Sequence, residues 1–318
     1  MITNDLQYAD VAEAVIDGFA KSPKRLPSWL FYDATGDKIF QAIMQMPEYY
    51  LTQCEVSVFE KYKVELLQKF IKNGSPFNLV ELGAGDGMKT EILLKYFISE
   101  GLKFRYSPID VSETVLLQLQ VRLKQSIPEL SMTPIHNRYT EGITSLTDDE
   151  LRKVFLFLGA NIGNFDVEGA TQFLSSIAAR MGHEDLLLVG FDLKKDPRII
   201  SSAYDDPHGI TNDFNLNLLT RLNRELGADF KLDQFSHNPF YDPSTGTTKS
   251  YLVSLEDQEV YLEACDEVVR FDQWEVIHTE VSQKYDVRMI EELAANAGLS
   301  IIDIFYDDRK YFCDVLFG

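Results

Sequence analysis

The chain of 318 residues carries 30 Lys and Arg against 50 Asp and Glu, a formal net charge of −20. Such a chain repels phosphate backbones and anionic lipid, and its longest basic run is Lys194-Lys195, so nucleic acid and membrane surfaces are not expected partners. Because 45% of the residues are hydrophobic, the chain can bury a substantial core, in about two domains or one elaborated domain.

The sequence indicates a cytoplasmic protein with reduced thiols. No apolar run approaches the ~18 residues of a membrane span, and the first residues lack the basic and apolar regions of a secretory signal. The cysteines, Cys54, Cys265 and Cys313, lie far apart, with no CxxC pair and no His at metal spacing. We therefore expect no disulfide and no structural zinc.

From Pro76 onward, strand-like and helix-like segments alternate, which is the pattern of a parallel sheet with crossover helices. The predicted strands are 77–82, 104–109, 132–136, 154–158 and 186–191. The predicted helices are 89–100, 115–126 with Ser112 as N-cap, and 167–181.

The alternation stops after Asp192. An amphipathic helix is predicted at 211–226, with Thr211 as N-cap and Gly227 as its stop, followed by strands at 247–254 and 276–282. The chain then ends with a predicted helix at 287–297 and a hairpin of strands 301–306 and 311–317.

Five βα units closed by a helix and an antiparallel hairpin resemble the Rossmann-like fold of S-adenosylmethionine (SAM)-dependent methyltransferases. The resemblance implies an α/β domain with a mostly parallel seven-stranded sheet and an antiparallel C-terminal hairpin, formed by residues 58–194 and 285–318. Residues 1–57 and 195–284 have no place in that sheet. We expect them to form a discontinuous second domain that binds the substrate.

A glycine-rich loop, Gly83-Ala84-Gly85-Asp86-Gly87, lies between the first predicted strand and its helix. Glycines there allow a tight turn and close approach to a ligand, although a turn that binds nothing has the same pattern. Asp110 ends the next strand, where a carboxylate would accept both hydroxyls of a ribose. Dinucleotide sites need Gly or Ala where this chain has Met88, so we favour SAM, which has no phosphate.

One motif is similar to a functional motif of another family but stands at a different place in the chain. Asn238-Pro239-Phe240-Tyr241 is similar to the Asn/Asp-Pro-Pro-Tyr motif of adenine-specific DNA methyltransferases. That motif follows the fourth strand, however, where this chain has Leu158-Gly159-Ala160-Asn161. Because Asn-Pro pairs favour turns, we predict a loop at 238–241.

Longer motifs are spread over nearly the whole chain. They are LPSWLFYDATGDKIFQAIMQMPEYYLTQCE at 26–55, VELGAGDGMKT at 80–90, PIDVS at 108–112, LGANIGNF at 158–165, AYDD at 203–206 with TNDFN at 211–215, and HTEVSQKY at 278–285. Together they resemble the L-histidine Nα-methyltransferases that make trimethylhistidine on the route to ergothioneine. The resemblance therefore implies SAM as methyl donor and histidine as first choice of acceptor.

The resemblance also implies roles for individual residues. The SAM-binding set is the glycine loop, the lysine after it and the acid of the second strand: Gly83, Gly85, Gly87, Lys89 and Asp110. Tyr32 would be the catalytic residue beside the reacting amine. The substrate-binding set holds the imidazole ring through Tyr49, Glu280 and Ser282, and the carboxylate end of the amino acid through Asn164 and Tyr204.

Two stretches depart from the family pattern. Arg138-Tyr139 occupies the place of an Asp-aromatic pair that touches the adenine, so this contact falls to the backbone or is lost, and we keep both residues in the cofactor site. Thr247-Thr248-Lys249-Ser250 replaces Arg-Ile-Glu-Met, whose Met lines the substrate pocket. Another amino acid or a small amine is therefore the alternative acceptor.

Each assignment has a purely structural alternative. The tyrosines fit half-buried core positions, Asn164 fits the N-cap of the helix after the fourth strand, and Glu280 and Ser282 fit one polar face of a strand. Lys89 is unfavourable in a first helical turn, which points to a role elsewhere.

Two remoter functions stay open at this stage. One is a nicotinamide-dependent oxidoreductase, which Met88 disfavours, and the other is a non-catalytic SAM-binding module. We expect a monomer that uses SAM, releases S-adenosylhomocysteine (SAH), acts on a small molecule and needs no metal.

Overall fold

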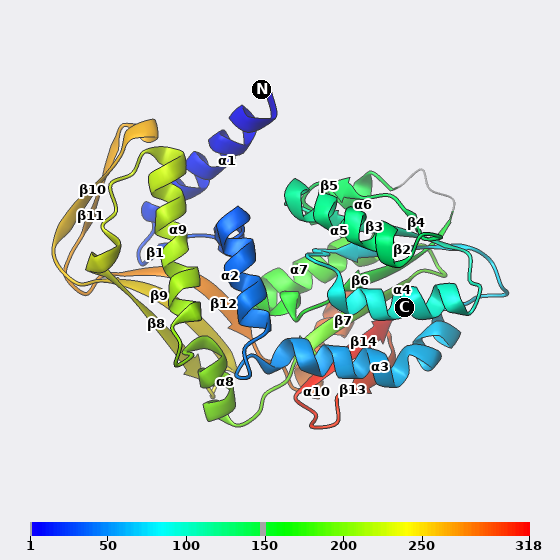
Figure 1. Ribbon diagram of the computed structural model, residues 1–318. Helices are drawn as coiled ribbons and strands as arrows, with labels where there is room; N and C mark the ends of the chain where they lie inside the picture. Colours follow the sequence, from blue (N-terminus) through cyan, green and yellow to red (C-terminus); the bar gives the residue numbers. More distant parts are fainter. Residues whose placement is uncertain (1, 147–150) are drawn as a thin grey trace. The chain divides into compact units, whose positions relative to one another are not determined.

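The computed structural model describes residues 2–146 and 151–318, so residues 1 and 147–150 of the expected domains lie outside the described part. The chain divides into two compact units (Figure 1). Unit 1 comprises Met1–Tyr49 and Lys195–Ser282, and unit 2 comprises Tyr50–Lys194 and Gln283–Gly318. The first division falls at 49/50 instead of the expected 57/58, because α3 (Tyr50–Phe70) is one continuous helix that packs within unit 2.

Unit 2 contains the predicted sheet, in the order β13-β14-β7-β6-β2-β3-β4 with β5 beside β3. Its strands are β2 (Phe77–Leu82), β3 (Phe104–Asp110), β4 (Ser131–Met132), β5 (Ile135–His136), β6 (Arg152–Phe157), β7 (Leu186–Asp192), β13 (Ile301–Tyr306) and β14 (Phe312–Phe317). The pairs among β2, β3, β6 and β7 are parallel, whereas β14 runs antiparallel to both β7 and β13. This confirms the Rossmann-like class with its antiparallel C-terminal hairpin.

The strand predicted at 132–136 is interrupted. The backbone N–H of Thr133 still bonds to the Tyr106 carbonyl oxygen, but Pro134 has no N–H to continue the ladder. The segment therefore forms two short strands beside β3, so that within the described residues the sheet has eight strands where seven were predicted.

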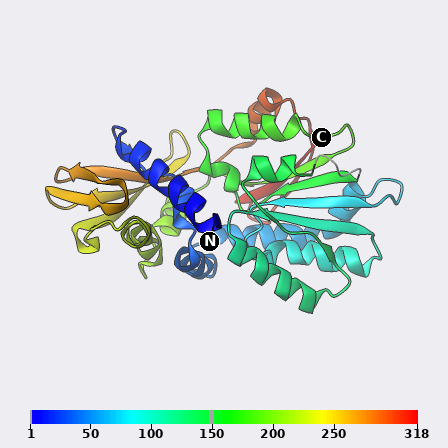
Figure 2. The ribbon, with the colours of Figure 1, turned by 90° about the horizontal axis from the view of Figure 1, so that it is seen from above.

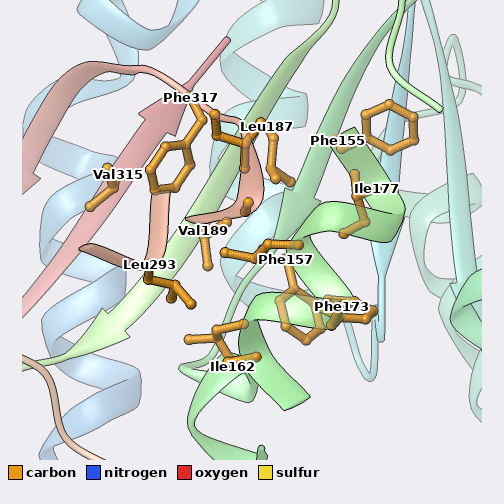
Figure 3. Packing of buried hydrophobic residues seen from close by; sticks show 14 of the residues in the cluster. Phe155, Phe157, Ile162, Phe173, Ile177, Leu187, Val189, Leu293, Val315 and Phe317 are labelled. Atoms are coloured by element: carbon orange, nitrogen blue, oxygen red, sulfur yellow. The ribbon is translucent and has the colours of Figure 1, made fainter. Parts of the chain in front are cut away.

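Helices cover both faces of this sheet (Figure 2). One face carries α3, α4 (Met88–Ser99) and α5 (Glu113–Ser126), and the other carries α6 (Tyr139–Thr144), α7 (Val167–Ala178) and α10 (Val287–Ala297). Because side chains alternate along a strand, Phe155 and Phe157 of β6 enter the core beneath α7 (Figure 3). Val154 and Leu156 enter the opposite core. Burial on both faces explains the apolar runs of β6 and β7.

Unit 1 is built on a sheet in the order β1-β12-β9-β8. Its elements are α1 (Ile2–Phe19), β1 (Lys24–Arg25), α2 (Ala34–Met44), α8 (Pro197–Tyr204), α9 (Ile210–Leu226), β8 (Phe235–Asp242), β9 (Thr247–Ser254), β12 (Val276–Gln283) and a hairpin of β10 (Gln258–Leu262) and β11 (Glu267–Phe271). The predicted apolar face of α9 is buried in the core of this unit.

Of the two predicted ends of α9, the C-terminal end is confirmed and the N-terminal end is wrong. Gly227 ends the helix in the left-handed conformation, as predicted. The N-cap is Gly209 and not Thr211, because the Asp206 carboxylate accepts the backbone N–H groups of Ile210 and Thr211 at 3.1 and 2.8 Å. An acid four residues upstream thus satisfies the first turn.

The prediction of a loop at 238–241 is wrong. These residues lie in β8, which pairs antiparallel with β9 in a register that joins Asn238 to Tyr251 and Pro239 to Ser250. In the strand order of this sheet β8 is an edge strand, and an edge tolerates a proline because its outward side needs no N–H donor.

In the described ranges, none of the helices combines the length and the hydropathy of a membrane span. Cys54, Cys265 and Cys313 are free thiols, and burial raises the pKa of Cys54 to about 11.

Candidate active site

The loop between β2 and α4 turns through left-handed backbone at Gly83 and Gly85, with φ of 71° and 53°. A Cβ at Gly83 would lie 2.8 Å from the Tyr139 hydroxyl, so a side chain is excluded there. Around a Cβ at Gly85, in contrast, there is nothing within 4 Å. The backbone at Gly85 is therefore open to a ligand, as a close-approach site requires.

Asp110 ends β3 directly beside this loop. Its Oδ2 accepts the backbone N–H of Gly85 at 2.9 Å, and its Oδ1 accepts that of Ser112 at 2.9 Å. Burial raises the pKa of Asp110, although these N–H groups oppose the shift. A carboxylate has about four lone-pair sites, so beside its backbone partners it can still accept a hydroxyl, and the pair Gly85 and Asp110 fits the ribose of an adenosyl ligand.

The two residues that depart from the family pattern differ in placement. Arg138 is exposed and precedes α6 as its N-cap. The Tyr139 ring packs edge-on against Phe157 at 5.5 Å, with its hydroxyl beside Gly83. Tyr139 therefore lies beside the glycine loop.

Lys89 in the first turn of α4 forms an ion pair with Glu55 of α3. Burial opposes the charge of Lys89, but the carboxylates of Glu55, Glu81 and Asp314 outweigh that effect and raise its pKa. The cation is therefore held by acids outside its own helix, which explains its unfavourable position at the helix start. Glu55 is the last residue of the motif at 26–55, but the sequence assigned no role to it.

Asn164 is the last residue of the 3-10 helix η2 (Asn161–Asn164), in unit 2. Its interpretation as the cap of α7 is wrong, because Asp166 is the N-cap and accepts the Gly169 N–H at 2.8 Å. The position of Asn164 is therefore not explained by helix capping.

In unit 1, three predicted substrate residues are joined through β12. Glu280 and Ser282 are two residues apart on this strand and project from one face. The Tyr204 hydroxyl of α8 donates to Ser282 Oγ at 2.8 Å, and Ser250 Oγ of β9 donates to Glu280 Oε2 at 3.1 Å. Ser250 thus touches the acid that the resemblance assigns to the imidazole ring.

Tyr32 and Tyr49 flank the same aromatic ring of unit 1. Each packs edge-on against Phe40 of α2, with ring centroids 5.7 and 6.1 Å apart. Phe214 of α9 lies 6.0 Å from Tyr32 and 5.8 Å from Phe40. Both tyrosines are half-buried and belong to one aromatic cluster.

Within the part of the chain that the structure describes, there is no group of three His, Cys, Asp or Glu side chains arranged to hold a metal ion. The candidate residues form two groups. One lies around the glycine loop in unit 2, and the other lies around β12 and Phe40 in unit 1.

A parallel sheet closed by an antiparallel strand, with a glycine loop backed by an acid on the next strand, is the architecture of SAM-dependent methyltransferases. The family described as histidine-specific methyltransferase, SAM-dependent, matches residues 11–318, and the chain belongs to this family.

Individual relatives agree with this membership. The chain is 34% identical over 308 residues to a histidine N-alpha-methyltransferase of Mycobacterium tuberculosis, covering 97% of this chain and 94% of that protein. It is 31% identical over 235 residues to ergothioneine biosynthesis protein 1 of Schizosaccharomyces pombe, covering 72% of this chain and 30% of that protein. A solved SAM-dependent methyltransferase of Clostridium acetobutylicum aligns with a TM-score of 0.41 and 11% identity, covering 88% of this chain and 94% of that one.

Proposed function

We propose that the protein transfers methyl groups from SAM to the α-amino group of free L-histidine, giving Nα,Nα,Nα-trimethylhistidine and SAH. The observation that carries the acceptor is the polar cluster on β12. There the Glu280 carboxylate accepts from Ser250 at 3.1 Å, and Ser282 accepts from Tyr204 at 2.8 Å. A carboxylate is an acceptor that suits the N–H of an imidazole ring.

The donor half of the proposal is supported by unit 2. Asp110 would accept the ribose hydroxyls, the open backbone at Gly85 would lie against the nucleoside, and Lys89 would meet the carboxylate of the amino-acid end. When bound, SAM would supply a methyl group on a sulfonium; a neutral amine can attack that methyl carbon and displace the thioether SAH without a metal. The residues of the chain then contribute alignment and exclusion of water.

The aromatic cluster suits the charge of the products. Methylation of the amine ends in a quaternary ammonium, and an aromatic face stabilises such a cation by about 0.5–2 kcal/mol. As the family resemblance implies, we assign Tyr32 to the place beside the reacting amine and Tyr49 to the imidazole ring; both rings lie against Phe40. Asn164 and Tyr204 are assigned to the carboxylate of histidine.

Ser250 supports one alternative acceptor. It is buried, with 1% of its surface exposed, and replaces the methionine that is typical of the family. A small residue there leaves more room beside Glu280, so a different amino acid or small amine with an N–H donor is the second candidate. The chemistry of transfer is unchanged in that case.

The test is incubation with SAM and a panel of free amino acids, with products identified by mass spectrometry. We expect trimethylhistidine as the main product. In Glu280→Ala, the loss of a charged hydrogen-bond acceptor should lower the preference for histidine over leucine by about tenfold or more. The matched control is Glu267→Ala, an exposed strand glutamate of β11, which should keep the wild-type preference. Unaltered histidine turnover in Glu280→Ala would refute the assignment.

We also propose that the enzyme acts as a cytoplasmic monomer and without metal. Light scattering at working concentration should give the mass of one chain, 36.3 kDa. Treatment with EDTA followed by gel filtration should leave the turnover unchanged, since an amine can displace the thioether from a sulfonium methyl carbon without a Lewis acid. A dimer mass or a loss of turnover that is restored by added metal would contradict these points.

A further inference from the structure

Glu55 is a fully buried acid of α3, with 0% of its surface exposed. Its carboxylate accepts the backbone N–H of Gly159 at 2.8 and 3.0 Å and forms an ion pair with Lys89. These partners belong to the turn after β6 and to the first turn of α4. One side chain thus fixes two segments at the carboxyl edge of the sheet.

The sheet leaves room for this carboxylate at one position. A Cβ at Gly190 of β7 would lie 2.5 Å from Glu55 Oε1, so a side chain there would force the carboxylate to move. Gly190 pairs in register with Asp314 of β14, whose side chain is also fully buried. Burial and the neighbouring Glu55 charge raise the pKa of Asp314 well above its usual range. Glu55 is the acid of this pair that faces Lys89, with which it forms the ion pair.

The strand order places this group at one end of the proposed donor site. Asp110 ends β3, the glycine loop follows β2, and Gly159 follows β6, which lies on the other side of β2. A ligand with its ribose at Asp110 that crosses Gly85 extends toward β6. Lys89 Nζ lies there, 2.9 Å from the place of a Cβ on Gly159. In SAM the end opposite the adenine is the amino acid.

We infer that Glu55 is a positioning residue for SAM, which holds the Lys89 ammonium and the Gly159 turn where the amino-acid end of the donor binds. This inference rests on the donor site of the proposed function. Glu55 itself does not touch the reacting atoms. Its effect should therefore depend on whether the ligand has an amino-acid end.

Two ligands separate this role from a merely structural one. SAH contains the amino-acid end, whereas 5′-methylthioadenosine keeps the adenosine and the thioether but lacks it. Glu55→Gln retains the size and an acceptor for the Gly159 N–H, yet removes the charge that orients Lys89. By calorimetry, the variant should bind SAH about tenfold more weakly and 5′-methylthioadenosine within about twofold of wild type. The KM for SAM should rise in parallel.

The matched control is Glu60→Gln on the same helix, where the side chain is 54% exposed and pairs with Lys63. It should bind both ligands as wild type does. If Glu55→Gln folds poorly, Glu55→Asp keeps the charge but draws it back by one methylene, and the same selective loss is expected to be smaller. An equal loss for both ligands, or no loss in a folded variant, would overturn the inference.

Failure of this inference can be told apart from failure of the proposed function. Wild-type protein that binds no SAH overturns both. Wild-type protein that binds SAH and methylates histidine, with no selective loss in Glu55→Gln, overturns only the role of Glu55.

Discussion

Replacement of Asp110 by asparagine should weaken the binding of SAH. Each carboxylate oxygen of Asp110 already accepts one backbone N–H, from Gly85 or from Ser112, at 2.9 Å. The asparagine amide has one oxygen and one NH2 group. In either orientation, the NH2 group therefore faces a backbone donor, and one acceptor for the ribose is lost together with the charge.

The size of the effect follows from that count. A hydrogen bond to a charged group contributes about 1.5–3 kcal/mol net, and 1.4 kcal/mol corresponds to a factor of ten in affinity. Loss of one such bond should raise the Kd for SAH roughly 10- to 150-fold. Donor–donor repulsion at Gly85 or Ser112 should also lower the stability of the variant.

Another aspartate of the chain provides a matched control for the loss of stability in Asp110→Asn. Asp185, at the amino end of β7, accepts the backbone N–H groups of Lys153 and Gly182, both at 2.7 Å. Asp185→Asn should lower stability in the same way and leave the Kd for SAH within about twofold, measured by calorimetry. If Asp110→Asn binds SAH as tightly as wild type, or if both variants lose affinity equally, the ribose assignment is refuted.

Three further predictions concern the interior of unit 2. Burial raises the pKa of Glu81 to about 7, above its usual 4.5, so the native state keeps a proton that the unfolded chain releases. The free energy of unfolding should therefore fall as pH rises from 4.5 to 7. In Glu81→Gln, the free energy of unfolding measured with urea should depend less on pH between about pH 5 and 8. Lys284→Met should lower the free energy of unfolding by about 3–5 kcal/mol, because it leaves the buried Asp192 carboxylate without the ammonium at 2.9 Å. The double variant Lys284→Met/Asp192→Asn should recover most of that stability. Equal free energies of unfolding for the single and double variants would contradict this. Gly83→Ala should weaken SAH binding and lower the Tm through its φ of 71° and its contact with Tyr139, and a variant indistinguishable from wild type would refute the steric argument.

Turn chemistry and apolar runs predicted the SAM-binding half of the fold well. The strand expected at 77–82 is β2 with the same ends, and Ser112 caps α5 by accepting the Val115 N–H at 3.3 Å. Gly85 and Asp110 meet because the carboxyl ends of neighbouring parallel strands lie at one edge of a sheet. These features depend on a few consecutive residues, so they can be seen in the sequence.

The errors arise where a residue's neighbours in space decide its state. Pro239 indicates a turn by its local chemistry, yet it is accommodated in β8 because that strand lies at an edge of the sheet. Asn164 has the residue type of a cap, but Asp166 two residues later occupies that position. In both cases the local preference is real and is overridden by packing or by a competing side chain.

The amino-acid sequence by itself determined the α/β class, the glycine loop, the acid at the end of the second strand and the family. Only the tertiary structure decided that Ser250 bonds to Glu280 and that Glu55 meets Lys89 and Gly159, partners that stand 30, 34 and 104 positions apart in the chain. The physical reason is the distance along the chain over which each effect acts. Periodicity and turn preferences act over a few residues, whereas the order of strands in a sheet and the room left by a residue such as Gly190 set which distant side chains share a site.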